Sequence, residues 1–380
     1  MSEINLGKLG FYWRMTDALN VPQNPVPDFV DFSFEFDEAH QLIIQKKNDQ
    51  TWEYLETIYN ENYNVGYLQE GHDLALSYGD DFLNFIEHTI SSYNSNVKRV
   101  FEIGAGGCYI LDRLKQKGLD VVAIDPSPIA AKAGNKYGIE VQNEFYPTKE
   151  KIEPSDLIIH YDVLEHVLDP WDFLRMHKND LTEGGLILFA VPDCSHYIPV
   201  GDISMILHEH INYYDQESLR NVVESAGFEV LEIKAAEYGG VLYCTAKVAK
   251  EETWVPKVGR EKAIKFENDI TQLKDKVTAF ILEGTQEGNT LGCYIPLRMV
   301  PYLSICGVNS NIRFFDDNTG IHHQYFDGFD AKVENMDELV EKPVTHLIIM
   351  SAIFGEIIKT KVMDRTVGSG MQIKCLNDFF

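Results

Sequence analysis

The sequence is poor in cysteine and has neither a long apolar run nor a basic leader. Its six cysteines are scattered, with no C-x-x-C pair, which argues against a zinc framework and is typical of a reducing compartment. No apolar run reaches the roughly 18 residues that a membrane-spanning helix needs. The N-terminus lacks a basic segment followed by an apolar one, so we expect no signal peptide. These absences predict a cytoplasmic protein with no membrane segment and no bound metal.

Positive charge is also scarce, because 33 lysines and arginines face 59 aspartates and glutamates and give a formal net charge of −26. Nucleic acids and anionic membranes both select cationic surfaces, so neither is expected as a partner. Any anionic substrate must therefore be met by a local basic pocket. The length of 380 residues is enough for two or three domains, each with its own core.

The strongest pattern lies at residues 100–108, Val-Phe-Glu-Ile-Gly-Ala-Gly-Gly-Cys. Its apolar first half predicts a buried strand, and apolar residues return at helical spacing from Tyr109. A strand, a glycine turn and a helix in this order present free backbone N–H groups to a ligand. The next apolar run ends in Asp125, where an acidic side chain can accept both ribose hydroxyls of a nucleoside.

The glycine spacing helps to choose between two nucleoside ligands. A dinucleotide site needs G-x-G-x-x-G, and Tyr109 stands where its third glycine would be. Glu102 would repel a pyrophosphate, but it suits the α-ammonium group of a methionine. Glu102, Gly104, Gly106 and Asp125 therefore favour S-adenosylmethionine over a dinucleotide or a purely structural turn.

Apolar and helical segments alternate between residues 97 and 250, which predicts a parallel α/β sheet. Five parallel strands and one antiparallel pair are expected, near 99–103, 120–124, 139–142, 156–161 and 185–191, then 229–233 with 241–246. Asp162 to His166 follow the fourth strand, so they should face the crevice of Gly104 and Asp125. For Glu165 and His166, an ordinary first turn of a helix explains the pattern equally well.

Residues 207–214, Leu-His-Glu-His-Ile-Asn-Tyr-Tyr, are dense in groups that titrate or form hydrogen bonds. A metal site using His208 and His210 lacks a clear third ligand. A histidine base that Glu209 orients is the better interpretation. A pair of buried structural histidines remains the alternative.

The two ends of the chain predict further domains. Residues 30–36 alternate as a half-buried strand with 41–44 as its hairpin partner, and Tyr63 and Tyr67 either pack in a core or line a ligand. A charged helix from 251 to about 276 is expected as a boundary. Strands near 290–296, 312–317 and 345–350 predict a second, degenerate Rossmann-like α/β domain. The expected domains are an aromatic-rich N-terminal region at 1–80, a cofactor-binding domain at 81–252 and the C-terminal domain at 253–380.

Assembled, the motifs resemble the class I S-adenosylmethionine-dependent methyltransferases, and more narrowly the nucleotide-sugar C-methyltransferases of deoxysugar biosynthesis. Four stretches carry the resemblance, at 100–104, 124–128, 163–167 and 208–213. It covers roughly residues 60 to 380. The His-Glu-His-x-x-Tyr stretch and the additional C-terminal domain are its specific features.

The resemblance implies a Rossmann-like methyltransferase domain and a role for each matched residue. His210, with Glu209, would remove a proton from the sugar carbon beside a ketone, and the enolate would attack the methyl group. The C-terminal domain would help to hold the nucleotide sugar. The implied cofactor residues are Tyr67, Glu102, Gly104, Ala105, Gly106, Asp125, Pro126, Ser127, Phe145, Asp162, Val163 and His166. The implied substrate residues are Tyr63, His208, Asn212, Tyr213 and Gly239.

The sequence departs from that family at three places. No cysteine precedes Cys108, so the zinc-binding cluster usual at the N-terminus is missing. Leu207 replaces the usual tyrosine before His-Glu-His, and Cys108 replaces the glycine that usually closes the first motif. Two alternatives follow: an O-methyltransferase acting on a hydroxyl of a sugar or another small molecule, and a non-catalytic binding protein that kept the fold.

Overall fold

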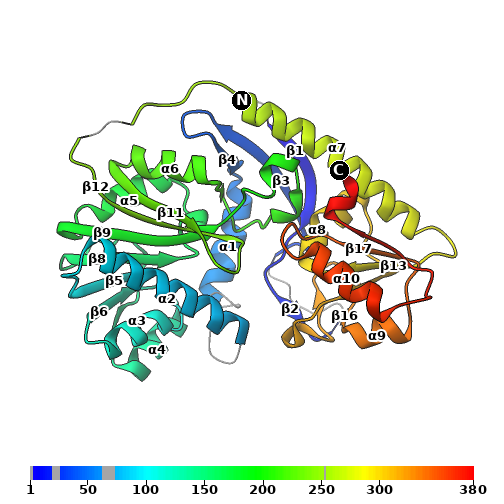
Figure 1. Cartoon of the computed structure of the whole chain (residues 1–380), viewed down its shortest axis with the longest axis horizontal. Helices are drawn as coiled ribbons and strands as arrows, with labels where there is room; N and C mark the ends of the chain where they lie inside the picture. The colour runs from blue at the N-terminus through cyan, green and yellow to red at the C-terminus, as the bar shows by residue number, and fades with distance from the viewer. Residues whose placement is uncertain (1–2, 19–25, 62–72, 252–253) are drawn as a thin grey trace.

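The computed structural model describes residues 3–18, 26–61, 73–251 and 254–380. Its strands form three large sheets and one short two-stranded ribbon. Figure 1 shows the central sheet and its helices on one side and the C-terminal sheet on the other, with the N-terminal strands between them at the top. None of the helices among the described residues is long and apolar enough to cross a bilayer.

The central sheet has seven strands in the order β11-β12-β9-β8-β5-β6-β7. Strands β5 to β9 are parallel to one another. The two strands that come last in the chain, β11 and β12, pair antiparallel with their neighbours, which confirms the predicted α/β sheet. The strands are β5 (Arg99–Ile103), β6 (Asp120–Ile124), β7 (Glu140–Gln142), β8 (Ser155–Tyr161), β9 (Leu181–Pro192), β11 (Phe228–Ala235) and β12 (Val241–Val248). The chain runs outward in opposite directions from β5, so the carboxyl ends of β5 and β8 form the switch point where such sheets bind ligands.

Each face of this sheet is buried under helices because the strands are apolar on both sides. One core joins residues such as Val100 and Ile159 to the helices on one face, and a second joins Phe101 and Phe189 to the helices on the other. The first face is covered by α2 (Asp73–Tyr93) and α3 (Tyr109–Gln116), and the second by α5 (Pro170–His177) and α6 (Gln216–Ser225). Helix α4 (Pro128–Tyr137) connects β6 to β7.

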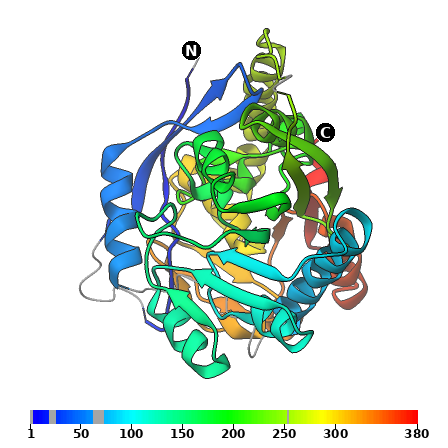
Figure 2. The same ribbon diagram turned by 90° about the vertical axis from the view of Figure 1, so that its left-hand side faces the viewer.

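The N-terminal sheet has the order β1-β3-β4-β10. Strands β3 (Phe29–Asp37) and β4 (Leu42–Gln45) pair antiparallel, which confirms the predicted hairpin, and β1 (Ile4–Gly10) lies beside β3. The fourth strand, β10 (Asn212–Tyr213), comes from the middle of the chain. Helix α1 (Asp49–Glu61) follows the hairpin and flanks it in the side view of Figure 2. The segment after His210 is thus held by a sheet whose other strands come from the first 45 residues.

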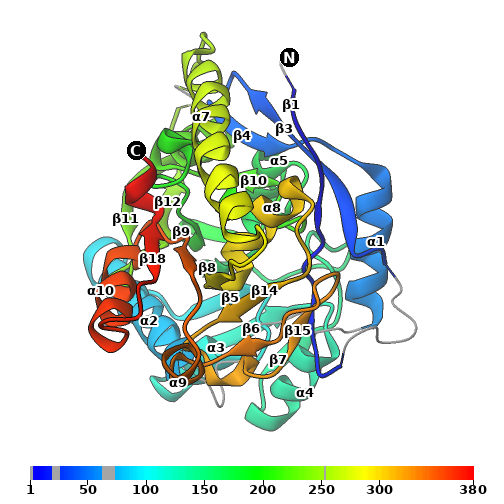
Figure 3. The same ribbon diagram turned by 90° about the vertical axis from the view of Figure 1, so that its right-hand side faces the viewer.

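The C-terminal sheet is parallel and has the order β16-β14-β13-β17-β18. Its strands are β13 (Leu291–Tyr294), β14 (Ile312–Phe315), β16 (Val333–Glu334), β17 (His346–Ile349) and β18 (Gln372–Cys375), with helices α8 (Pro296–Cys306), α9 (Met336–Glu341) and α10 (Gly355–Arg365). The long helix α7 (Glu261–Gly284) leads into it and lies along the side of the molecule beside α8 and the N-terminal strands (Figure 3). A short ribbon pairs β2 (Met15–Thr16) with β15 (Tyr325–Phe326).

One core joins the N-terminal and C-terminal sheets. Phe34 of β3, Tyr213 of β10, Phe266 of α7, Met299 of α8 and Phe314 of β14 all belong to it. The N-terminal strands therefore pack on the C-terminal domain as well as on the segment that carries His210. The expected domain boundaries at 80 and 252 stay predictions.

Two helix starts differ from the sequence interpretation. The helix expected from residue 81 already begins at Asp73, and the helix expected from 251 begins only at Glu261. Pro256 and Gly259 explain the second difference, since both residues disfavour a helix interior. The helix continues to Gly284 instead of ending near 276, because apolar residues such as Val277, Phe280 and Ile281 still face the core there.

Candidate active site

The glycine turn after β5 has the conformation that its sequence predicts. Gly104 has a φ of +75° and Gly106 a φ of +49°, both in the left-handed region that favours glycine. The N–H of Gly104 donates to the carbonyl of Ile124 at 2.9 Å. A Cβ on Gly104 would lie 2.7 Å from Cγ2 of Val163, so a larger residue would push the loop after β8 away.

Asp125 ties the loops after β5 and β6 together. Its Oδ2 accepts a hydrogen bond from the N–H of Gly106 at 2.8 Å, and its Oδ1 accepts one from the N–H of Ser127 at 2.7 Å. Ser127 in turn caps α4 by accepting from the N–H of Ala130 at 3.2 Å, next to the exposed Pro126. Each carboxylate oxygen can accept more than one hydrogen bond. The side chain can therefore still accept from the ribose hydroxyls that the sequence assigns to it.

Glu102 is a buried carboxylate beside this turn. It is 3% exposed, and its Oε2 has no hydrogen-bond partner among the described residues. Burial, and then the charge of Asp125, raise the pKa of Glu102 well above its ordinary value. A cationic group bound beside it would stabilise the ionised form. The orphaned oxygen and the glycine cradle together fit a cofactor that carries an α-ammonium group and a nucleoside.

The remaining predicted cofactor residues lie on the loops at the same end of the sheet. The carbonyl of Ala105 accepts from the N–H of Cys108 at 2.7 Å, and Cys108 closes the turn with a φ of +55° where a glycine would be unstrained. Phe145 follows β7 and is 66% exposed, so its ring is free to cover a ligand. Asp162, with a φ of +52°, turns the chain out of β8 into Val163.

A second group of titratable side chains follows β8. His166 donates from Nδ1 to the backbone carbonyl of Glu209 at 2.9 Å, and its ring centroid lies 5.0 Å from that of His210. Glu165 is 1% exposed, and neither carboxylate oxygen has a hydrogen-bond partner within the described part of the chain. Burial, and then the charge of Asp162, raise the pKa of Glu165 well above its ordinary value. Burial, and then the charge of Glu209, raise the pKa of Asp162 to about 7.

This second group could also coordinate a cation. One donor atom each of Glu165, His166 and His210 lies within 4.8 Å of the others, and a carboxylate with two imidazoles is a donor set that divalent transition metals accept. The sequence pointed to His208 as the partner of His210 and found no third ligand. The expectation that the protein binds no metal therefore stays a prediction.

His210 is a half-buried imidazole whose pKa lies well below its ordinary value, because burial and the charges of His166 and Arg298 disfavour protonation. It is therefore neutral near pH 7 and has a lone pair with which to accept a proton. Glu209 contacts the His166–His210 pair through its backbone, because its carbonyl accepts the hydrogen bond from Nδ1 of His166. Among the described residues, neither imidazole donates a hydrogen bond to the Glu209 carboxylate, so its orienting role stays a prediction.

Three of the predicted substrate residues have structural partners in the core. The Nε2–H of His208 donates to the carbonyl of Val30 at 3.1 Å, and the ring packs edge-on against Phe11 and Phe32. The hydroxyl of Tyr213 donates to the carbonyl of Leu207 at 3.1 Å, and the side chain is 1% exposed. These contacts support the segment that carries His210, and the substrate contacts of His208 and Tyr213 stay predictions.

Asn212 is the third of these residues and braces the turn that carries Glu165 and His166. It is 3% exposed, and its amide donates to the carbonyl of Leu164 at 3.2 Å and to that of Val167 at 2.6 Å. Both N–H groups are thus used by backbone acceptors. Asn212 therefore positions this turn, and its contact with substrate stays a prediction.

Replacing Asn212 tests this bracing role. Asn212→Ala removes two buried hydrogen bonds, so we expect kcat to fall about fivefold. This corresponds to an activation free energy that is higher by about 1 kcal/mol. Asn212→Asp should be worse, because a carboxylate would face the two carbonyls without a donor. The measurement is kcat and melting temperature for both variants, with the exposed Asn96→Ala as control. Equal activity of the Ala and Asp variants would contradict the bracing role.

The other predicted residues lie apart from these two groups or outside the described chain. Tyr63 and Tyr67 fall within residues 62–72, which the structure does not describe. Gly239 has a φ of +76° in the loop between β11 and β12, and a Cβ there would lie 3.2 Å from Cδ1 of Ile353. This glycine therefore lets the loop approach the C-terminal domain closely, and its contact with substrate stays a prediction.

Arg298 is the residue that the sequence interpretation missed. It lies in the first turn of α8, directly after β13, and its charge helps to lower the pKa of His210. Its position in the sequence was a signal for a functional role. Arg298 follows the first strand of the C-terminal domain, just as Asp162, which the sequence predicted as a site residue, follows β8.

The fold and these two groups define a class of protein. A doubly wound sheet with a glycine turn after β5, an acidic residue after β6 and titratable residues after β8 is the arrangement of α/β domains that bind nucleosides at the carboxyl ends of their strands.

Comparison with known proteins identifies the domain more closely. Residues 77–233 match the family model described as a methyltransferase domain. The C-methyltransferase NovU of Streptomyces niveus is 26% identical over 246 residues, which are 58% of this chain and 58% of that protein. A ubiquinone biosynthesis O-methyltransferase of Caulobacter sp. (strain K31) is 31% identical over 100 residues, 24% of this chain and 40% of that protein. The alignments thus span only about half of these relatives.

One solved structure similar to this chain is Burkholderia thailandensis 1,6-didemethyltoxoflavin-N1-methyltransferase with bound 1,6-didemethyltoxoflavin and S-adenosylhomocysteine. It is 14% identical with a TM-score of 0.42, covering 57% of this chain and 99% of that one. Residues 77–233 therefore form a methyltransferase domain, the kind of domain that the motifs predict.

Proposed function

We propose that this protein transfers a methyl group from S-adenosylmethionine to a carbon of an activated, nucleotide-linked keto sugar. The observation that carries the proposal is His210, a neutral imidazole held beside the loop after β8, at the carboxyl ends of the strands where such sheets bind ligands. The similarity to a C-methyltransferase over 58% of the chain supports it. The cofactor would supply an electrophilic methyl group.

In this proposal the protein's residues bind, orient and deprotonate. Glu102, Asp125 and the glycine turn hold the cofactor. His210 accepts the proton from the carbon next to the ketone, and the resulting enolate carbon would then take the methyl group from the sulfonium sulfur, with S-adenosylhomocysteine as the leaving group. The free thiols of all six cysteines agree with a reducing compartment, so we place the protein in the cytoplasm.

The leading alternative is transfer to a hydroxyl oxygen of a sugar or another small molecule. The partial similarity to ubiquinone biosynthesis O-methyltransferases favours it, as does the loss of the tyrosine at position 207. In that reaction His210 would take the proton from the hydroxyl instead.

Proton exchange separates the two reactions without turnover. The protein is incubated in D₂O with S-adenosylhomocysteine and a panel of nucleotide keto sugars, and the sugars are followed by NMR. A C-methyltransferase should exchange the proton next to the ketone, because the enolate forms and is then reprotonated. An O-methyltransferase should leave that proton in place. With S-adenosylmethionine, a methyl branch on carbon rather than a methyl ether should be found.

Cofactor binding tests the second alternative, a non-catalytic binding protein. Isothermal titration should show micromolar binding of S-adenosylmethionine and S-adenosylhomocysteine and no binding of NAD⁺. Binding without turnover of any acceptor, together with no proton exchange, would favour the non-catalytic alternative. No binding of either compound would contradict the methyltransferase proposal as a whole.

A further inference from the structure

Arg298 differs from seven of the other eight arginines of this acidic protein. Seven of the nine arginines have a carboxylate oxygen within 4.0 Å: Arg14, Arg99, Arg113, Arg175, Arg220, Arg313 and Arg365. Arg298 has no carboxylate within that distance among the described residues. With 59 acidic residues against 33 basic ones, an arginine that is left without an acidic partner needs an explanation.

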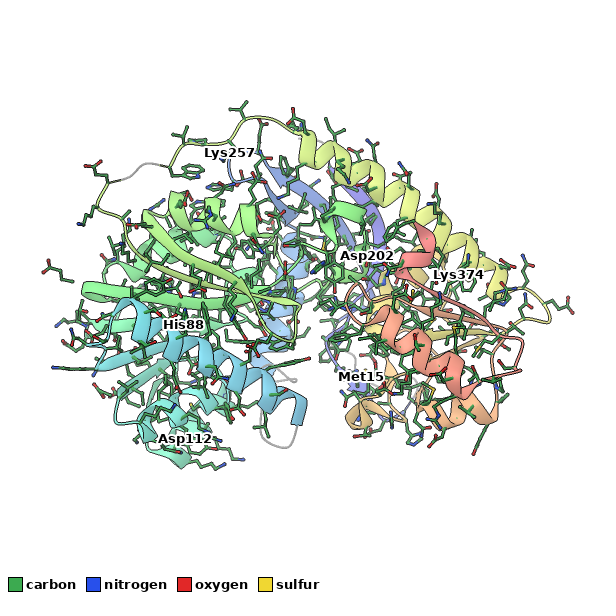
Figure 4. The ribbon with its side chains drawn as sticks, in the orientation of Figure 1. Met15, His88, Asp112, Asp202, Lys257 and Lys374 are labelled. Carbon is green, nitrogen blue, oxygen red and sulfur yellow. The ribbon has the colours of Figure 1, made fainter. Side chains whose placement is uncertain are left out.

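Asp202 has an electrostatic interaction with Arg298, but its hydrogen bonds go to other groups. Its Oδ1 accepts from the N–H of Ser204 and from the hydroxyl of Tyr302, both at 2.9 Å, and its Oδ2 accepts from the Ser204 hydroxyl at 2.8 Å. Figure 4 shows Asp202 in the middle of the molecule, between the central and C-terminal sheets. Neutral donors therefore satisfy this carboxylate, and among the described residues no carboxylate oxygen lies within 4.0 Å of the guanidinium group.

The guanidinium group is nevertheless held in place. Its Nη1 donates to the carbonyl of Ser204 at 3.1 Å, and its central carbon lies 5.4 Å from the centre of the Tyr197 ring. A guanidinium has five N–H donors, and this is the one hydrogen bond from Arg298 recorded within the described residues. The remaining donors are available in a fixed fork that matches two phosphate oxygens.

The position of Arg298 connects it to the methyl acceptor. Its partner Ser204 lies on the same segment as His210, a few residues earlier, and the charge of Arg298 reaches the imidazole of His210 and the thiol of Cys194. Arg298 itself belongs to the first turn of α8, where the helix dipole also favours an anion. A group bound at Arg298 would thus lie where the C-terminal domain contacts the segment that carries the proposed base.

We propose that Arg298 binds the phosphate oxygens of the methyl acceptor and so anchors its diphosphate beside His210. This inference rests on the proposed methyltransferase function and names the residue that holds the anionic part of its substrate. The proposal also agrees with the composition. Because the protein has a net charge of −26, it can bind an anion only where a local positive charge exceeds the negative potential of the rest of the protein.

Isothermal titration in the presence of S-adenosylhomocysteine tests the proposal with three probes: inorganic pyrophosphate, UDP and uridine. The wild type should bind pyrophosphate and UDP, and Arg298→Gln should weaken both at least tenfold. Arg298→Lys should be intermediate, because the charge remains but the fork is lost. Uridine, which has no phosphate, should respond equally in all variants. Arg220→Gln, which removes an exposed arginine from α6, is the matched control.

The affinity for S-adenosylhomocysteine shows whether each variant is folded and should not change. Equal binding of pyrophosphate and UDP by the wild type and Arg298→Gln would overturn the proposal. The proposal would also be overturned if the wild type bound S-adenosylhomocysteine but neither pyrophosphate nor UDP. The proposed methyltransferase function would then remain. Equal losses of diphosphate and S-adenosylhomocysteine binding in both Arg298 variants would show a structural role and also overturn the proposal. A wild type that does not bind S-adenosylhomocysteine would instead contradict the proposed function.

Discussion

Replacing His210 by asparagine should reduce methyl transfer by about 10²–10⁴-fold, the contribution typical of a positioned general base. Asparagine has a similar shape and remains polar, but its amide cannot accept a proton near pH 7. The affinity for S-adenosylhomocysteine should change little, because the residues of the glycine turn and Asp125 are untouched. Initial rates with S-adenosylmethionine and the identified acceptor, together with isothermal titration of S-adenosylhomocysteine, measure the two effects separately.

A histidine far from this group provides the control. His88 lies on α2 with its side chain 53% exposed, and Figure 4 shows it among the helices of the central sheet. His88→Asn should keep full activity. If His210→Asn turned over within a few-fold of the wild type, His210 would not be the base. Loss of the solvent exchange at the sugar carbon in His210→Asn would tie its role to proton removal rather than to substrate binding.

Replacing Asp125 by alanine should weaken cofactor binding by about 1–3 kcal/mol, which corresponds to roughly 5- to 150-fold in Kd. Two effects combine in this variant. The ribose hydroxyls lose a charged acceptor, and the N–H groups of Gly106 and Ser127 lose the oxygens that tie their loops together. Isothermal titration of S-adenosylmethionine and S-adenosylhomocysteine measures the loss directly.

Asp120 provides a control on the same strand. It begins β6, whereas Asp125 directly follows the other end, and its side chain is 61% exposed beside Arg99. Asp120→Ala should leave the affinity for the cofactor unchanged. An unchanged affinity in Asp125→Ala would remove Asp125 from the site. A partial recovery in Asp125→Asn would separate the contribution of the loop hydrogen bonds from that of the charge, because its one oxygen can still accept from one of the two N–H groups.

Local sequence determined most of the fold. The strands of the central sheet are short apolar runs between polar turns, and the parallel arrangement follows from the helical segments between them. The turn at Gly104 and Gly106 was predictable because the left-handed backbone is a property of the residue itself. Asp125 could be placed because it directly follows a strand. Its hydrogen bond from Ser127 is local, whereas its hydrogen bond from Gly106 depends on the pairing of β5 with β6.

The roles of the two histidines in His-Glu-His could only be decided by the tertiary structure. His208 and His210 are equivalent by residue type and almost adjacent in sequence. The partner of His208 is the carbonyl of Val30 in an N-terminal strand, whereas His210 faces His166 from the loop after β8. Asn212 became a brace for the same reason, since its acceptors follow β8. These partners are distant in the sequence and no local pattern encodes them.

The cation that would meet an anionic substrate likewise could be expected from the sequence but identified only from the tertiary structure. Composition alone required that an anionic substrate meet a local cation, but it could not say which of nine arginines that is. The choice of Arg298 depends on the hydrogen bonds of Asp202 with Ser204 and Tyr302, which leave Arg298 without a carboxylate in contact among the described residues. The sequence by itself thus determined the strands, the glycine turn and the cofactor class, because these depend on residue type and near neighbours. The tertiary structure decided which polar side chains remain available for a ligand, because that depends on which other groups the fold brings to them.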